Sequence, residues 1–205
     1  MIKIIGRLSS INVRKVVWAA QECGTPFERM DAGMQFGVVN TPEYLALNPN
    51  ALVPTLVDGE LVLWESNVIV RYLCAKYGGA LYPADLAQRF DAERWMDWQQ
   101  TTLNRAGGQA FIQWFRTPTE QRQPEVIAAS VAATEPLLSW LNKHLSQQAY
   151  MAGASFGMAD LVIGVEIHRW FALPQPRPSW PHLEAWYAQV LARPATRGVL
   201  DLPVS

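Results

Sequence analysis

The sequence predicts an α/β unit followed by an all-helical half, and two observations support this division. Over the first 78 residues, short apolar runs of strand length alternate with segments of helical periodicity, in the order β-α-β-α-β-β-α. Beyond about residue 87 no convincing strand remains, and apolar residues recur only at helical spacing. We therefore expect two domains, residues 1–80 and 87–205, with a linker near residues 79–87.

The composition limits the classes of function. Half of the 205 residues are hydrophobic and the formal net charge is −1, so the core is ample and no basic surface suggests a nucleic-acid partner. No apolar run approaches the roughly 20 residues that span a bilayer, and residues 1–10 lack the apolar segment of a signal peptide. We expect a cytoplasmic protein without a membrane partner, in which Cys23 and Cys74 are reduced, buried thiols. Three scattered histidines and no CxxC or HExxH motif argue against a metal site.

The first elements form a strand, a helix and a second strand. Residues 2–5 are an apolar run of strand length, and residues 12–21 carry apolar side chains at helical spacing with Asn12 as the expected N-cap. Cys23-Gly24 ends this helix, and Pro26 prevents it from resuming. Residues 27–31 then predict a strand parallel to the first, because a helical crossover joins them.

The next elements are a short helix, a hairpin and a longer helix. The short helix is expected near residues 41–47 and the first hairpin strand at residues 53–57. Asp58-Gly59 is a hairpin turn signal, and residues 61–63 form the return strand. Residues 65–77 have the spacing of a helix with one buried face, closed by Gly78-Gly79.

The second half predicts helices at residues 86–105, 125–145, 158–171 and 182–191. Pro136 lies inside the second of these. Because proline lacks an amide hydrogen and its ring collides with the preceding turn, we expect a kink or a break there.

The dipeptide Val53-Pro54 precedes the third strand and suggests a peptide-binding edge. An X-Pro bond loses most of its preference for trans, and a cis bond there would leave the N–H and C=O of Val53 facing away from the sheet. An extended peptide could pair with both groups. A trans proline that merely begins an edge strand is the alternative, which the local sequence leaves open.

The dipeptide Glu65-Ser66 opens the third helix. A serine there brings its hydroxyl, its amide and the positive end of the helix dipole together, which suits a carboxylate. The neighbouring Glu65 could pair with an amine, so the two residues match the α-amino-acid end of a ligand. A simple capping role for Ser66 is the alternative.

Together, the VP turn before two strands and the ES pair that opens the third helix resemble the glutathione transferase superfamily, bacterial Ser-type members related to the theta and nu classes in particular. The resemblance covers nearly the whole chain, since GASFGMADL in the second half is similar to that family's helix-start motif. It implies a thioredoxin-like N-terminal domain, an all-α C-terminal domain and glutathione as co-substrate. It further implies that Val53 and Pro54 hold the cysteinyl part of glutathione, that Glu65 and Ser66 hold its γ-glutamyl end, and that Asp160 is a folding element bonded back to the turn before its helix.

The resemblance also places a hydroxyl donor at the end of the first strand, where the stretch GRLSSINVRKVVW has no Tyr or Cys. In several Ser-type members the active serine lies four residues before an arginine, and here Ser10 lies four residues before Arg14. Ser10-Ile11-Asn12 also matches the (T/S)-x-N pattern of a bacterial group. We therefore expect Ser10 to donate to the sulfur with help from Asn12, while other members' spacing would choose Ser9. A hydroxyl that donates to a thiolate stabilises the anion more than the thiol.

The sequence departs from the family where many relatives carry Lys, Gln or Arg for the glycyl carboxylate, because Leu52 stands at that position. Gln35 or Asn40 is a possible substitute. The family's electrophile pocket lies between the two halves, and our candidates for it are large or charged helix residues: Trp98, Arg105, Phe111, Trp114 and Trp170.

The resemblance implies a transferase that conjugates glutathione to small hydrophobic electrophiles in detoxification, and a homodimer, as in most of the family. Two alternatives remain. One is a glutathione-dependent peroxidase or disulfide reductase of the same fold. The other is a non-catalytic module that binds glutathione or a protein. The sequence does not identify the physiological electrophile or decide between Ser9 and Ser10.

Overall fold

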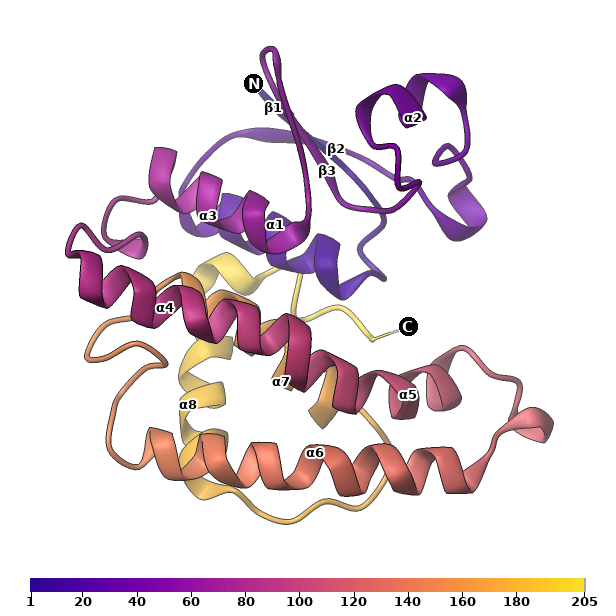
Figure 1. The fold of residues 1–205 in the computed structure, drawn as a ribbon, viewed down its shortest axis with the longest axis vertical. Helices are drawn as coiled ribbons and strands as arrows, with labels where there is room; N and C mark the ends of the chain where they lie inside the picture. The colour runs from indigo at the N-terminus through magenta and orange to yellow at the C-terminus, as the bar shows by residue number, and fades with distance from the viewer. Residues whose placement is uncertain (205) are drawn as a thin grey trace.

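A four-stranded sheet organises the first part of the chain in the computed structural model, which describes residues 1–204 (Figure 1). Its strands are β1 (Ile2–Ile5), β2 (Phe27–Met30), β3 (Thr55–Asp58) and β4 (Leu61–Trp64), in the order β2-β1-β3-β4. β1 and β2 are parallel, as predicted, while β3 is antiparallel to both of its neighbours. The predicted element order and the α/β class are confirmed.

The helices α1 (Ile11–Glu22) and α3 (Ser66–Tyr77) pack against each other, and α2 (Pro42–Leu47) stands apart at the edge of the unit (Figure 1). The expected N-cap of α1 was wrong. Ser10 occupies that position, because its backbone is extended (φ −91°, ψ 124°) and its carbonyl accepts the Arg14 amide at 3.0 Å. Asn12 therefore lies in the first turn of α1 rather than before it.

The second part contains helices without a strand in the described residues: α4 (Leu86–Trp98), α5 (Asn104–Phe115), α6 (Pro124–Leu145), α7 (Met158–Phe171) and α8 (Pro181–Leu191). The helix expected to end near Arg105 continues through a π-helical segment, η3 (Gln99–Leu103), into α5. Short 3₁₀ turns complete the chain: η1 (Met34–Phe36), η2 (Gly79–Leu81), η4 (Thr119–Gln121) and η5 (Pro194–Thr196).

The helix α6 does not break at Pro136 but runs through it as a single element. Pro136 is on the exposed side, so water can satisfy the carbonyl that its missing amide leaves free. On the opposite side Thr134, Leu138 and Leu141 are buried and hold both halves of the helix against the core.

The two parts share one hydrophobic core, with α7 at its centre (Figure 1). Trp18 on α1 packs so closely against Gly164 on α7 that a Cβ there would lie 3.0 Å from the indole ring. This contact, between residues that are distant in the sequence, fixes α1 and therefore the start of the sheet unit against the helices. No helix among the described residues has the length and apolarity needed to cross a membrane.

Candidate functional site

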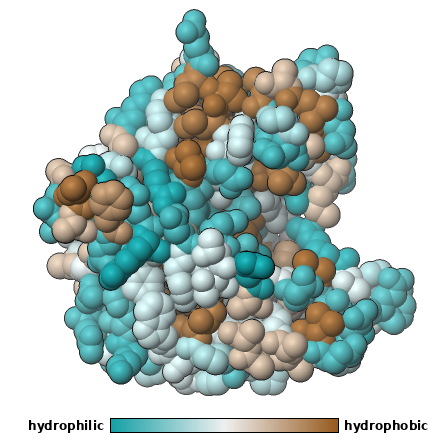
Figure 2. Space-filling view, viewed as in Figure 1, coloured by the Kyte–Doolittle hydropathy of each residue, from teal (hydrophilic) through white to brown (hydrophobic). Residues whose placement is uncertain are grey.

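Three adjoining hollows form a groove between the sheet unit and the helices, and Asn12 lines all of them. The first contains Glu65, Ser66 and the turn before β3, the second contains Ser10, and the third lies on α5. In this view the molecule is hollowed on the side between α2 and α5 (Figure 2).

The turn before β3 offers an unbonded backbone to the groove. The Val53-Pro54 bond is cis, and neither the N–H nor the C=O of Val53 has a partner among the described residues. The turn is held by its neighbour, because the Leu52 carbonyl accepts from the Tyr44 hydroxyl at 2.6 Å and from Asn48 Nδ2 at 2.8 Å. Val53 lines both the first and the second hollow, so an extended ligand can pair with it there.

Ser66 is the first residue of α3, and Glu65 occupies the N-cap position before it. The Ser66 hydroxyl does not cap its own helix but donates to Asn12 Oδ1 at 3.2 Å. Glu65 has φ +70°, a conformation that non-glycine residues rarely adopt, and its exposed carboxylate has no partner among the described residues. The helix start therefore presents free amides beside a free carboxylate.

Ser10 and Ser9 differ in what surrounds them. Ser10 lines the second hollow, and its hydroxyl forms no hydrogen bond within residues 1–204. Ser9 lines none of the three hollows, and its Oγ is buried without a partner there. Arg14 fixes the loop that carries Ser9 and Ser10. Its Nε donates to the Leu8 carbonyl at 2.7 Å, and its other two nitrogens donate to the Leu202 and Pro203 carbonyls.

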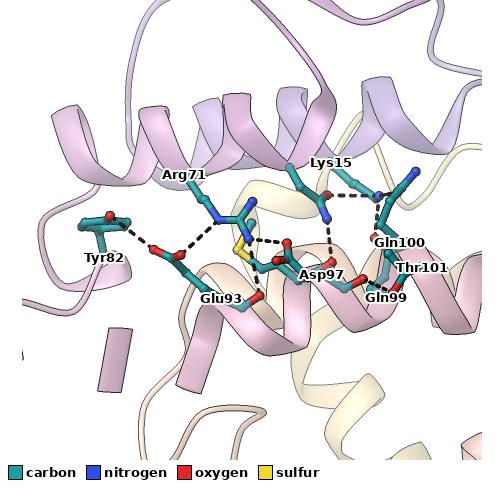
Figure 3. A network of polar contacts seen from close by, with 10 residues as sticks. Lys15, Arg71, Tyr82, Glu93, Asp97, Gln99, Gln100 and Thr101 are labelled. Atoms are coloured by element: carbon teal, nitrogen blue, oxygen red, sulfur yellow. Dashed lines mark hydrogen bonds and ion pairs between the residues drawn. The ribbon is translucent and has the colours of Figure 1, made fainter. Parts of the chain in front are cut away.

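A buried lysine supports the first hollow (Figure 3). Lys15 has no exposed surface, and its Nζ donates to Asn67 Oδ1 at 3.2 Å, Gln99 Oε1 at 2.7 Å and Gln100 Oε1 at 3.2 Å. Burial lowers the pKa of Lys15 to about 7, although the carboxylate of Glu166 acts to raise it. These bonds join α1, α3 and η3 directly beneath the groove.

Two consecutive glutamines in the π-helical segment make different contacts. Gln99 is buried, and its Nε2 donates to Glu166 Oε2 at 2.8 Å. Gln100 lines the first hollow, and because Lys15 holds its oxygen, its amide nitrogen is left to donate. Such segments often mark functional sites, but no local sequence pattern predicted this one.

A second set of contacts clamps α3 to α4 (Figure 3). Arg71 donates to Asp97 Oδ1 at 2.5 Å and lies 3.8 Å from Glu93 Oε2, while Asn67 Nδ2 donates to the Met96 carbonyl at 2.7 Å. The start of α3, and Ser66 with it, is thus fixed against the helical part.

Of the five candidates for the electrophile pocket, Arg105 and Phe111 line the third hollow, with Asn104, Ile112 and Arg169 as residues that sequence reasoning missed. The three tryptophans lie elsewhere. Trp98 makes edge-to-face contacts with Trp95 and Trp140 at a separate hollow, because α4 turns it away from the groove. Trp114 Nε1 donates to Gln175 at 2.6 Å, and Trp170 is buried against Gly107.

Gln35 and Asn40 are exposed and line none of the three hollows, although their neighbours Met34 and Val39 line the second. Arg7 lines the same hollow and was missed, since a lone arginine after a strand carries no motif. Asp160 lies outside the groove. It is buried and accepts from the Gly157 amide at 3.0 Å, the Met151 amide at 2.9 Å and Trp186 Nε1 at 2.9 Å.

Cysteine and metal chemistry lie outside the groove as well. Cys23 is only half-buried, contrary to prediction, because it follows the last turn of α1; Cys74 is buried. Neither lines the three hollows. Among residues 1–204, no cluster of three or more His, Cys, Asp or Glu side chains could hold a metal ion.

Comparison with known proteins gives consistent matches along the chain. The family model "Glutathione S-transferase, N-terminal domain" matches residues 2–75, and "Glutathione S-transferase, C-terminal domain" matches residues 124–189. The chain is 40% identical to glutathione S-transferase GstB of Escherichia coli (strain K12), with all of both sequences covered. It is 33% identical to glutathione S-transferase theta-3 of Mus musculus, over 90% of this chain and 80% of that one.

Among solved structures, the chain is similar to the theta class glutathione S-transferase from the citrus canker pathogen Xanthomonas axonopodis pv. citri with glutathione bound. The TM-score is 0.97 at 45% identity, and the match covers all of this chain and 99% of that one.

Proposed function

Because the chain belongs to the glutathione transferase superfamily, we propose that it conjugates reduced glutathione to small hydrophobic electrophiles. Full-length relatives at 40–45% identity are named as glutathione S-transferases, so the chain is a transferase enzyme. The proposal concerns the electrophile, the residues that act and the place where glutathione lies.

One observation carries the proposal: unbonded groups of the required kinds line a single groove in the required order. The free carboxylate of Glu65 and the amides that begin α3 suit the amino-acid end of the γ-glutamyl residue. The unbonded N–H and C=O of Val53 suit the cysteinyl backbone, and Ser10 and Asn12 then lie beside the sulfur. Glutathione is also bound in the similar Xanthomonas structure.

The chemistry requires an ionised sulfur. A free thiol has a pKa of about 8.5, so only a few per cent is thiolate at pH 7. Ser10 donates its hydroxyl hydrogen to the sulfur, and the N-terminal end of α1 adds a favourable dipole, so both stabilise the anion. With an aryl halide, the thiolate attacks the halogen-bearing carbon and the halide departs with its electron pair. With an isothiocyanate, the thiolate adds to the central carbon and the nitrogen takes up a proton from solvent. Ser10 remains a hydrogen-bond donor throughout.

A calorimetric titration with glutathione, followed by assays against aryl halides, isothiocyanates, hydroperoxides and glutathione mixed disulfides, tests the proposal. Formation of a thioether from aryl halides, or of a dithiocarbamate from isothiocyanates, supports it. Turnover of hydroperoxides or disulfides alone would instead favour the peroxidase or reductase alternative. Binding without turnover would favour a non-catalytic module, and an absence of glutathione binding would refute the assignment of the groove.

The proposal includes a homodimer, a cytoplasmic location and a role in detoxification. Support for a second copy comes from apolar side chains left exposed on β4, α3 and α4, namely Leu61, Trp64, Val68, Leu86 and Phe90. In the space-filling view, apolar side chains gather over the upper part of the molecule, where the sheet unit lies (Figure 2). Sedimentation of Phe90→Glu alongside the native chain tests whether this surface holds the dimer together.

A further inference from the structure

Arg7 stands where the chain leaves β1, and its side chain lines the second hollow together with Ser10 and Val53. Its Nη1 approaches the backbone of Gly33 so closely that a Cβ there would lie 2.9 Å from it. Gly33 also has φ +85°, so the backbone that accommodates the guanidinium is one that glycine adopts most readily. The side chain is therefore held at the wall of the groove.

This guanidinium has no partner of its own. A guanidinium carries five N–H donors. Within residues 1–204 no group accepts from any of them, and the Nε atom is buried. Burial lowers the pKa of Arg7, and the positive charge of Arg116 lowers it further. A half-buried cation without a partner, close to a second positive charge, is unfavourable unless an anion joins it.

Arg116 reaches the same place from the helical part. It follows the end of α5, its Nη2 donates to the Ser9 carbonyl at 3.3 Å, and its Nη1 contacts the sulfur of Met34 at 3.1 Å. Met34 lines the second hollow beside Arg7. The loop that carries Ser9 and Ser10 is thus bordered by Arg7 from the sheet unit and by Arg116 from the helical part.

We propose that Arg7, with Arg116 beside it, forms a carboxylate-binding subsite next to Ser10. A guanidinium matches a carboxylate through two parallel N–H···O bonds, which a lysine or an amide cannot reproduce. The inference rests on the proposed function for its ligand, and two molecules in the reaction could supply the group.

One source is glutathione itself. The first and second hollows meet at Leu52 and Val53. With its amino end at Glu65 and its cysteinyl residue on Val53, the tripeptide would direct its glycyl carboxylate into the hollow that Arg7 lines. Leu52 cannot bind that carboxylate. The other source is an acidic electrophile, whose carboxylate would bind Arg7 while its reactive carbon faces the sulfur beside Ser10.

The test uses matched pairs that differ in one carboxylate. The first pair is glutathione and its glycyl ethyl ester, measured by calorimetry. The second is 4-chloro-3-nitrobenzoate and 4-chloro-3-nitrobenzamide, measured by direct binding and by kcat/KM. Arg7→Gln removes the charge, and Arg7→Lys keeps the charge but removes the two parallel N–H donors of the guanidinium. Arg197→Gln is the control, because Arg197 is exposed and its side chain has no partner among the described residues.

For the carboxylate member of at least one pair, Arg7→Gln is expected to lose roughly 10- to 100-fold in affinity or kcat/KM, with Arg7→Lys in between. The neutral member and the Arg197→Gln control should change less than about twofold. The pair that responds identifies the source. Circular dichroism and thermal unfolding establish that each variant is folded, and Arg7→Lys provides a second folded variant.

Equal losses for both members of each pair, or no loss for any, would overturn the subsite. Failure of the native protein to bind glutathione would instead refute the proposed function. In that case the direct binding of 4-chloro-3-nitrobenzoate still decides the inference, because an unchanged affinity in Arg7→Gln would overturn it and a specific loss would uphold it.

Discussion

The Ser66 hydroxyl donates to the Asn12 side-chain oxygen at 3.2 Å, across 54 residues of sequence. The bond joins the N-terminal ends of α3 and α1, the two helix ends that border the groove. It also orients Asn12. With its oxygen bound to Ser66, its amide nitrogen has no partner among the described residues and is free to donate into the groove.

This bond predicts that Ser66 and Asn12 act as a unit. Ser66→Ala should lower kcat/KM for glutathione partly by releasing Asn12, so the effects of Ser66→Ala and Asn12→Ala should not add. We expect a coupling free energy of about 1 kcal/mol in a double-mutant cycle on kcat/KM. Strict additivity would show that the two side chains contribute independently.

Ser10→Ala should raise the pKa of the bound thiol and lower kcat/KM, since the sulfur loses a donor. We expect a loss of about 1–3 kcal/mol in transition-state stabilisation. The thiolate absorbance of the glutathione complex, followed against pH, gives the pKa directly. Ser9→Ala is the matched control and should be nearly neutral; if it is the more damaging change, Ser9 faces the sulfur instead.

Lys15→Met should weaken glutathione binding without removing any groove residue. Three side-chain oxygens would lose their donor, and Gln100 would lose the bond that orients it. We expect the free energy of unfolding to fall by about 2–4 kcal/mol and the affinity for glutathione to fall with it. Denaturant unfolding and calorimetry measure the two effects. Lys3→Met, at an exposed position of β1, is the control.

Asp160→Asn should reduce stability but leave the chemistry intact. The carboxylate accepts three hydrogen bonds in a fully buried site, and the amide nitrogen of asparagine would face one of those donors. We expect a loss of about 2–3 kcal/mol in the free energy of unfolding. The kcat measured well below the unfolding temperature should be unchanged; a large fall in kcat would show that Asp160 also affects the groove.

His168 predicts a loss of stability in acid. Burial, and then the charge of Arg14, lower the pKa of His168 to about 4, from about 6.5 in the unfolded chain. Between these values the unfolded state binds more protons, so this contribution is present above pH 6.5 and is lost as the pH falls through 4. Because each unit of pKa difference corresponds to about 1.4 kcal/mol, the loss should be about 3 kcal/mol.

Unfolding by urea at several pH values checks this contribution. In His168→Gln the part of the pH dependence that is due to His168 should disappear, because glutamine does not titrate. The glutamine side chain can still accept a hydrogen bond from Arg14, as His168 does. His182→Gln, at an exposed position, should keep the native pH profile. The same slope in His168→Gln and in the native chain would assign the acid sensitivity to other groups.

Much of the architecture followed from local patterns. The strand and helix order of the first 78 residues was predicted because each element carries its own periodicity and its own stop signal, such as Cys23-Gly24 or Asp58-Gly59. The predictions that failed concerned features that depend on residues brought close by the fold. Nothing local shows that Pro136 is exposed, that Trp98 points away from the groove or that Ser10 rather than Asn12 caps α1.

The sequence by itself determined the fold class, the family and the short motifs at Val53-Pro54 and Glu65-Ser66, since each depends on residues adjacent in the chain. Only the tertiary structure decided which distant side chains interact: Ser66 bonds to Asn12, Lys15 bonds to Gln99 and Gln100, and the charge of Arg116 acts on Arg7. The physical reason is that two residues brought together by packing leave no periodic or local pattern in the sequence around either of them. A buried lysine or an arginine without a partner becomes informative only when its surroundings are known.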